Sequence, residues 1–264
     1  MIKVAVSGAL GKMGKEVIKA VTNDEQTVLV SAIDKFEVGS DIGEIVLHKE
    51  NGVLISDDAE KDFTKSNPDV VVDFTQPSAV FENAKRYINL GIASVIGTTG
   101  LKDEQIAELS ALSKEKNVAC LIAPNFSTGA VLMMKFAQMA SKYFDNAEII
   151  ELHHNQKKDA PSGTAVKTAK MMSEAKESFT NGNCVEKELI EGSRGGGSYS
   201  NIHIHSVRMP GYMASQEVLF GSDGQILTIR HDSSNRACYM PGVRMAVEYI
   251  AKHDEFVWGL ENIL

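Results

Sequence analysis

The densest group of side chains that could do chemistry lies in residues 151–164, which read ELHHNQKKDAPSGT. The run offers two imidazoles, an ammonium group and a helix start with a hydroxyl: His153, His154, Lys157, Ser162, Gly163 and Thr164. The start of a helix exposes backbone N–H groups that bind anions. Imidazole and ammonium groups beside such a start suit a substrate that bears carboxylates, and they supply a proton donor.

The sequence alone allows two other roles for His153 and His154: metal binding and a purely structural role. Adjacent histidines are poor joint zinc ligands, and neither a further histidine four residues away nor a nearby cysteine completes a metal site, so we expect no metal. A structural role for His153 and His154 is the remaining alternative. His203 and His205 share one face of a predicted strand, which we expect to be partly solvated or to form an interface.

A glycine-rich turn between the first predicted strand and the first predicted helix indicates a dinucleotide site. It reads GALGKMG in residues 8–14. Glycines allow a tight turn and the close approach of a pyrophosphate, which the helix N-terminus attracts. The spacing departs from the commoner G-x-G-x-x-G, so a plain strand–helix turn is the alternative. Asp34 ends the next strand, where a carboxylate accepts hydrogen bonds from a ribose, and Lys35 could pair with a 2′-phosphate. This pair is compatible with both NADH and NADPH.

Two further loops follow predicted strands at their carboxyl ends, where open α/β sheets bind ligands. The loops consist of Gly97, Thr98 and Thr99, and of Ala123, Pro124, Asn125 and Phe126. We expect them to contact the nicotinamide and its ribose, with two ordinary turns as the alternative.

The first half of the chain must position the dinucleotide residues. Short apolar runs at residues 2–6, 28–33, 53–55, 70–74, 93–96 and 118–122 predict strands, and residues 12–21, 78–90 and 103–116 predict helices. Residues 36–52 predict a loop. Apolar strands that alternate with helices indicate a doubly wound α/β fold with a parallel sheet.

The pattern changes after about residue 124. Ser127 and Ser162 can cap helices that run to about residues 143 and 176. Residues 147–152, 202–207, 215–221 and 225–231 predict strands, residues 178–198 predict a loop, and residues 239–252 predict a helix that returns to the first domain. We therefore expect an α+β domain with a mixed sheet, and a ligand cleft between two domains.

Composition excludes several classes of partner. The 264 residues carry a formal net charge of −8, which disfavours nucleic acid and anionic lipid as partners. Three cysteines without a C-x-x-C spacing fit a reducing cytoplasm. The chain shows neither a signal peptide nor an apolar run of about 20 residues that would span a bilayer.

At residues 151–165 the chain resembles the dihydrodipicolinate reductase family, whose signature reads E-x-H-H-x-x-K-x-D-A-P-S-G-T-A. The resemblance extends to residues 8–14, 97–99, 124–126, 206–211 and 240–243, and so spans nearly the whole chain. It implies an NAD(P)H-dependent enzyme that reduces the cyclic dicarboxylate formed from 4-hydroxy-tetrahydrodipicolinate, in diaminopimelate and lysine synthesis. It also implies a Rossmann-type domain (1–126 and 235–264) and a domain for substrate binding and homotetramer formation (127–234).

The resemblance also implies roles for single residues. His153 would be the acid/base residue and Lys157 the proton donor. The residues that would hold the substrate carboxylates are His154, Gly163 and Thr164. The residues that would hold the cofactor are Gly8, Ala9, Leu10, Gly11, Lys12, Met13, Asp34, Lys35, Gly97, Thr98, Thr99, Ala123, Pro124, Asn125 and Phe126.

Two pairs of residues depart from the family pattern, and two other functions are alternatives. Asn155 and Gln156 stand where many relatives are more basic, which weakens the positive field of the pocket. Family members vary at Asp34 and Lys35, so the preference for NADH or NADPH stays open. The alternatives are another dehydrogenase of the same architecture and a dinucleotide sensor without catalysis.

Overall fold

The chain forms two compact units in a computed structural model that describes residues 1–180, 185 and 187–264. Unit 1 consists of Met1–Ser127 and Tyr239–Leu264, and unit 2 of Thr128–Cys238. Each unit has its own sheet and its own apolar core. The predicted loop at 178–198 includes 181–184 and 186, which lie outside the described residues, as does Cys184.

Unit 1, all of whose residues are described, contains a seven-stranded parallel sheet in the order β12-β6-β5-β4-β1-β2-β3. The strands are β1 (Ile2–Ser7), β2 (Thr27–Ile33), β3 (Ile55–Ser56), β4 (Val70–Asp73), β5 (Ala93–Ile96), β6 (Cys120–Ile122) and β12 (Phe256–Trp258). The chain leaves β1 towards β2 on one side and later places β4 on the other side. The strand order therefore reverses beside β1, the place where such sheets bind ligands.

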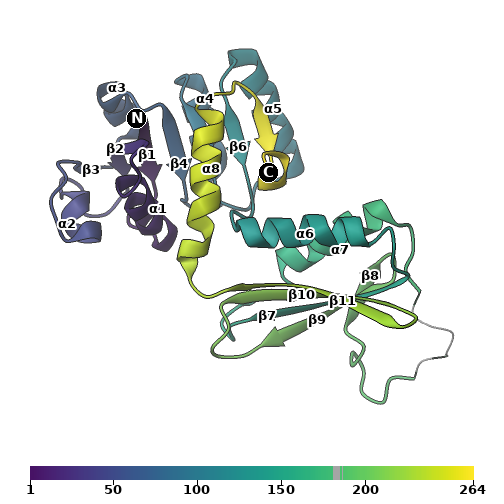
Figure 1. The fold of residues 1–264 in the computed structure, drawn as a ribbon. Helices are drawn as coiled ribbons and strands as arrows, with labels where there is room; N and C mark the ends of the chain where they lie inside the picture. The colour runs from purple at the N-terminus through teal and green to yellow at the C-terminus, as the bar shows by residue number, and fades with distance from the viewer. Residues whose placement is uncertain (181–184, 186) are drawn as a thin grey trace. The chain divides into compact units, whose positions relative to one another are not determined.

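Helices cover both faces of this sheet (Figure 1). They are α1 (Lys12–Thr22), α2 (Ile42–Leu47), α3 (Ala59–Ser66), α4 (Val80–Asn89), α5 (Asp103–Lys116) and α8 (Met240–Ile250), with a short 3-10 turn, η2 (Leu260–Asn262). Helices α3, α4 and α5 pack Phe63, Ile88 and Leu109 into one buried cluster with the strands. Helices α1 and α8 contact each other and the sheet. This is the doubly wound α/β arrangement that the sequence predicts.

Three elements of unit 1 differ from the sequence-based expectation. Residues 36–52 are not all loop, because α2 forms there. Asp41 caps it by accepting from the backbone N–H groups of Gly43 and Glu44, and it accepts from Gly52 as well. No pattern predicted α3 or β12. The three residues of β12 form a strand through their pairing with β6.

In the described part of unit 2, five strands form a mixed sheet in the order β11-β10-β7-β9-β8. The strands are β7 (Asn146–His153), β8 (Gly196–Tyr199), β9 (Ile202–Arg208), β10 (Ala214–Ser222) and β11 (Gln225–Ser233). Strands β7 and β9 run parallel, and the remaining pairs are antiparallel. The predicted loop at 178–198 is wrong from residue 196, because pairing with β9 makes an edge strand of a glycine-rich segment.

Two helices, α6 (Thr128–Ala140) and α7 (Gly163–Ala175), pack against each other and cover one face of this sheet (Figure 1). Ile149 of β7 and Ile204 of β9 are buried with Ala165 and Met172 of α7. Since side chains alternate along a strand, Glu151 and His153 lie on this same helix-covered face. After β11, the short 3-10 turn η1 (Arg236–Tyr239) leads the chain back to α8.

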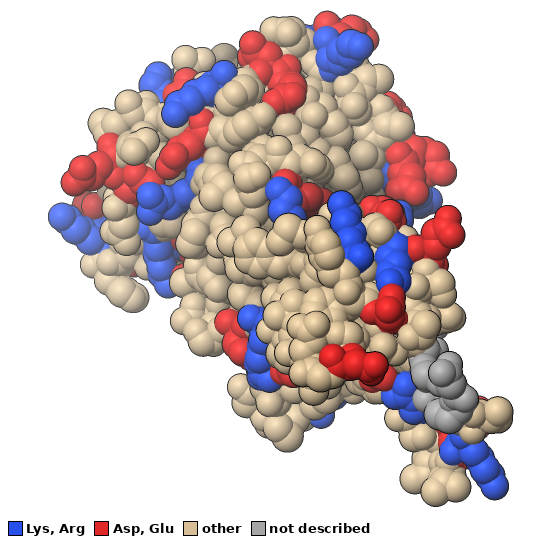
Figure 2. Space-filling view, turned by 45° about the vertical axis from the view of Figure 1, so that its right-hand side comes forward, with Lys and Arg blue, Asp and Glu red and all other residues tan. Residues whose placement is uncertain are grey.

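Charged side chains of both signs are interspersed over the face of the described chain in Figure 2. The net charge of −8 is therefore the sum of a mixed surface.

Candidate functional site

The end of strand β7 places His153 beside a buried carboxylate. His153 is the last residue of the strand, and its Nδ1 lies 2.5 Å from Oε2 of Glu151, two residues earlier on the same face. A carboxylate can only accept, so Nδ1 carries the hydrogen and donates it. This fixes the ring and leaves Nε2 as its second proton-transfer atom.

Glu151 has no exposed surface and is held from several sides. Arg208 donates two hydrogen bonds to it, at 2.9 Å and 2.7 Å, and the backbone N–H of Ser162 donates a third at 3.2 Å. Burial raises the pKa of this carboxyl, but the hydrogen bonds from His153, Arg208 and Ser206 outweigh burial and lower the pKa to about 2. The carboxylate is therefore ionised at neutral pH.

Lys157 lies in the loop after β7 and is paired with a carboxylate of its own. Its Nζ donates to both oxygens of Asp159 at 2.8 Å, and this ammonium lowers the pKa of Asp159 below its usual value. Nη2 of Arg208 also donates to the backbone carbonyl of Asp159 at 2.7 Å. Arg208 thus contacts the carboxylate that holds His153 and the residue that holds Lys157.

The start of α7 has the features of an anion site. Ser162 caps the helix, as predicted, by accepting from the N–H of Ala165 at 3.2 Å. A Cβ added to Gly163 would meet no atom within 4 Å, so there is open space beside this first residue of the helix, whose N-terminus attracts anions. Thr164 follows in the first turn. His154 is exposed, and its Nδ1 accepts from the N–H of Gln156 at 3.2 Å.

The turn after β1 requires its glycines for steric reasons. Gly8 has a φ of 79°, and a Cβ there would lie 2.4 Å from the carbonyl oxygen of Phe74. A Cβ on Gly14 would lie 2.0 Å from the carbonyl oxygen of Gly8. The turn is therefore pressed against the loop after β4 and against the first turn of α1. Only a chain without side chains at these points can pack this closely.

The N-terminus of α1 fits a dinucleotide phosphate. Helix α1 begins at Lys12 after Gly11, no side chain in the described part of the chain caps it, and its first turn holds no acidic residue. Its backbone N–H groups and the helix dipole therefore favour an anion. Asp34 follows β2, and its carboxylate accepts from the N–H of Leu10 at 2.9 Å, while Lys35 is exposed. This puts the carboxylate beside the glycine turn, where a ribose would lie.

The two remaining loops lie at the same edge of the sheet, after β5 and β6. Thr98 is buried, and its hydroxyl donates to Asp73 at 2.8 Å, so its side chain is engaged within the protein. Thr99 and Pro124 are exposed, and Phe126 packs edge-on against Phe74 with ring centroids 5.8 Å apart. Exposed backbone of these loops is what a cofactor could contact. Ala123 and Asn125 complete the second loop.

Comparison with known proteins identifies the family. The profile described as "Dihydrodipicolinate reductase, N-terminus" matches residues 2–126, and the one described as "Dihydrodipicolinate reductase, C-terminus" matches residues 129–264. The chain belongs to the dihydrodipicolinate reductase family. The 4-hydroxy-tetrahydrodipicolinate reductases of Lysinibacillus sphaericus and Listeria innocua are both 49% identical to it. The alignments cover all of this chain and 99% and 100% of those proteins.

Solved structures agree with this membership. A dipicolinate-bound dihydrodipicolinate reductase from Paenisporosarcina sp. TG-14 superimposes with a TM-score of 0.90 at 45% identity, with both chains covered completely. An amine dehydrogenase from Mycobacterium smegmatis superimposes with a TM-score of 0.71 at 14% identity, which shows the fold alone. The chain is therefore an NAD(P)-dependent oxidoreductase with a Rossmann-type fold.

Three residues that shape the candidate site of this family member had no predicted role. Glu151 and Asp159 lie inside the signature run, and the only sequence signal for a role at the site was that their side chains are acidic. Arg208 is 57 residues from Glu151 in sequence, and the parallel pairing of β7 and β9 brings them together. Arg208 stands in register with His153. A cation at the carboxyl end of a neighbouring strand was the available signal.

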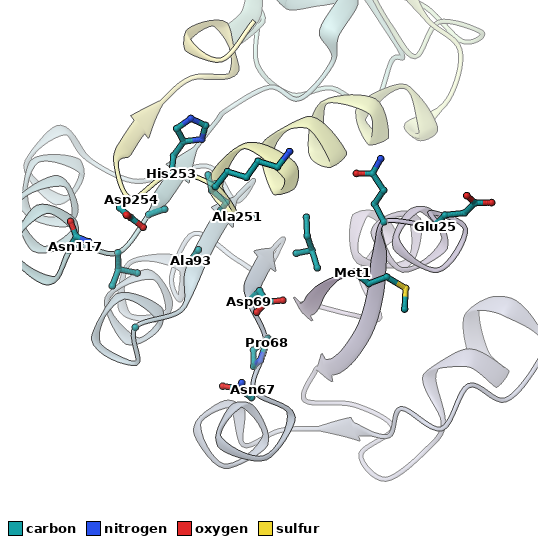
Figure 3. Close-up of a pocket in the computed structure, with 17 residues that line it drawn as sticks. Met1, Glu25, Asn67, Pro68, Asp69, Ala93, Asn117, Ala251, His253 and Asp254 are labelled. Carbon is teal, nitrogen blue, oxygen red and sulfur yellow. The ribbon is translucent and has the colours of Figure 1, made fainter.

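Two other observations concern the reductase fold. Within the described residues, no group of three or more His, Cys, Asp or Glu side chains could hold a metal ion, and no helix is long and apolar enough to cross a membrane. A hollow of about 820 Å³ opens in unit 1 (Figure 3), lined among others by Met1, Asp69, Ala93 and His253. Met1, Asp69 and Ala93 lie where β1, β4 and β5 begin, and His253 lies in the loop before β12. The glycine turn, by contrast, lies where β1 ends. The hollow is therefore at the edge of the sheet opposite the candidate cofactor loops.

Proposed function

We propose that this protein reduces the cyclic dicarboxylate formed from 4-hydroxy-tetrahydrodipicolinate to tetrahydrodipicolinate, with NADH or NADPH, in diaminopimelate and lysine synthesis. Loss of water from 4-hydroxy-tetrahydrodipicolinate gives dihydrodipicolinate, and a hydride and a proton then complete the reduction. The observation that carries the proposal is the joint attachment of His153 and the start of α7 to one buried carboxylate, Glu151. It sets a proton-transfer group beside an anion site, as a dicarboxylate substrate requires.

The protein residues would bind, orient and protonate the substrate. His153 would act as acid/base through Nε2, and Lys157 would donate the proton that the reduced ring takes up. His154, Gly163 and Thr164 would hold the carboxylates, through the imidazole, the helix N–H groups and the hydroxyl. The geometry at Gly163 supports this, because its surroundings leave space for a ligand.

The cofactor would supply the hydride, and the loops at the carboxyl edge of the parallel sheet would hold it. Gly8, Ala9, Leu10, Gly11, Lys12 and Met13 would surround the pyrophosphate, and Asp34 and Lys35 would contact the adenosine ribose. Gly97, Thr98, Thr99, Ala123, Pro124, Asn125 and Phe126 would lie at the nicotinamide end. In this scheme, residues 1–126 and 235–264 are the dinucleotide-binding domain. Residues 127–234 are the domain for substrate binding and tetramer formation.

We also propose a homotetramer in the cytoplasm. Family resemblance suggests assembly through the sheet of unit 2, whose outer β11 leaves Ile226 80% exposed and Leu227 37% exposed. A reductase that consumes NADH or NADPH works where metabolism regenerates these cofactors. Light scattering should give four times the mass of one chain, and a monomer would contradict this part of the proposal.

The function can be tested by the oxidation of NADH and NADPH at 340 nm. Aspartate semialdehyde, pyruvate and an added synthase would generate the unstable substrate in place. Substrate-dependent oxidation is expected, and the two rates would show which cofactor Asp34 and Lys35 favour. A folded protein that binds NADPH without oxidising it would favour the sensor. Oxidation only with another carbonyl or imine substrate would favour a different dehydrogenase.

A further inference from the structure

The buried carboxylate of Glu151 contacts both the candidate acid/base residue and the start of α7. Its Oε2 accepts from His153, and its Oε1 accepts from Ser162 at the start of α7. Arg208 donates to both oxygens. The fully buried side chain of Glu151 thus fixes the imidazole of His153 and the start of α7. It also binds the guanidinium of Arg208 in a bidentate ion pair.

Arg208 extends the same arrangement to the second proton-handling residue. The nitrogen that contacts Oε1 of Glu151 also donates to the backbone carbonyl of Asp159. The side chain of Asp159 in turn holds the ammonium of Lys157. A planar guanidinium presents its donors in a fixed fork, so the direction of Glu151 sets the direction of the contact with Asp159. The two proton-handling residues are therefore linked by four consecutive polar contacts.

Stability alone is a weak reason for this arrangement. A buried ion pair loses much of its attraction to the cost of desolvation, and an apolar pair of similar volume often gives an equally stable protein. An apolar pair could not orient an imidazole or hold a loop carbonyl. Catalysis, by contrast, is sensitive to displacements of about 1 Å in the reacting groups.

We propose that Glu151 and Arg208 are positioning residues for the reduction. In this scheme Glu151 sets the tautomer and direction of His153, and Arg208 fixes the loop that carries Lys157. The pair acts on the protonation of the substrate, and not on the binding of the dinucleotide. This inference rests on the proposed function.

The test compares Glu151→Gln, the double variant Glu151→Gln/Arg208→Gln, and Glu148→Gln as a matched control. The single variant leaves the partly buried charge of Arg208 without its partner. The double variant replaces the ion pair with two amides and removes that charge, which should restore folding. Glu148 lies three residues earlier on β7, on the opposite face, and accepts from His205 and Arg194 much as Glu151 accepts from His153 and Arg208.

Five quantities would be measured on each full-length protein: the melting temperature, the mass in solution, the Kd for NADPH, kcat in the coupled assay, and the ratio of kcat in H2O to kcat in D2O. We expect Glu151→Gln to lower kcat by roughly 10- to 100-fold, with the Kd for NADPH within about twofold of wild type. The ratio of kcat in H2O to kcat in D2O should rise, because misplaced groups make proton transfer more rate-limiting. The double variant should regain melting temperature but not kcat. Glu148→Gln should keep kcat and the solvent ratio, with the same mass in solution as wild type.

Two results would overturn the inference. One is a double variant whose kcat recovers together with its melting temperature, since the pair would then serve stability alone. The other is a loss of kcat in Glu151→Gln that Glu148→Gln matches at an unchanged solvent ratio. Failure of the proposed function is separate, because the wild-type protein itself would then show no substrate-dependent oxidation.

Discussion

At the scale of single residues, Glu151 should make folding stability depend on pH in the acidic range. Its carboxyl has a folded pKa of about 2, below the ordinary 4.5, so the folded state favours the ionised form. The stabilisation is fully present above about pH 4.5 and is lost as the pH falls towards 2. Its full size is on the order of 3 kcal/mol.

Denaturant unfolding of wild type and Glu151→Gln between pH 6 and pH 3 measures this contribution. The difference in unfolding free energy between the two proteins should be largest near pH 6 and should shrink below about pH 4.5. A difference that stays constant over this range would mean that the carboxyl is not held in its ionised form by His153 and Arg208.

Lys157 is the residue for which the sequence itself offers the best control. Lys157→Ala removes the proposed proton donor, so kcat should fall by about 10²- to 10⁴-fold. The neighbouring Lys158 is exposed, and Lys158→Ala removes the same charge from the same loop. It should leave kcat within a few-fold of wild type. Steady-state rates and NADPH titrations would check both variants, and equal loss of kcat and of NADPH affinity in Lys157→Ala would contradict the proton-donor role.

At the scale of elements, a substitution in the first turn of α7 should weaken ligand binding without weakening folding. A Cβ on Gly163 meets no atom within 4 Å, and alanine is a better helix residue than glycine, so Gly163→Ala should melt at or above the wild-type temperature. The added methyl group would occupy the approach to the helix N–H groups. Affinity for dipicolinate, a stable dicarboxylate, should therefore fall at least roughly tenfold.

Gly221 of β10 provides the matched control, because a Cβ there also meets nothing within 4 Å. Gly221→Ala should leave dipicolinate affinity unchanged in a calorimetric titration. If both variants bind dipicolinate like wild type, the start of α7 does not hold a substrate carboxylate.

Elements with a strong local pattern were predictable from the sequence, and elements made by distant contacts were not. Strand β5 and helix α5 follow their apolar patterns and have the predicted bounds. Helix α2 depends on the contacts of Asp41 with Gly43 and with Gly52, which lies eleven residues away. The same reason applies at the site. His153 and Lys157 stand out by type and spacing, whereas the role of Arg208 depends on strand pairing.

At the scale of the whole molecule, each candidate site is built from residues of one unit. The glycine turn, Asp34 and the loops after β5 and β6 belong to unit 1, and the segment from Glu151 to Thr164 belongs to unit 2. Each unit has a buried apolar core of its own. A defect confined to the packing of one unit should therefore reduce the ligand binding of that unit and spare the other.

Gly14→Ala tests this independence. Its Cβ would lie 2.0 Å from the carbonyl oxygen of Gly8, so the glycine turn and α1 must move apart, at a cost of roughly 1–3 kcal/mol. Affinity for NADPH should fall strongly, and dipicolinate should bind in the absence of cofactor with wild-type affinity. Gly163→Ala should show the reverse, with NADPH bound normally. Calorimetric titration of both ligands against both variants gives four affinities, and parallel losses of the two ligands in Gly14→Ala would mean that the units fold or bind as one.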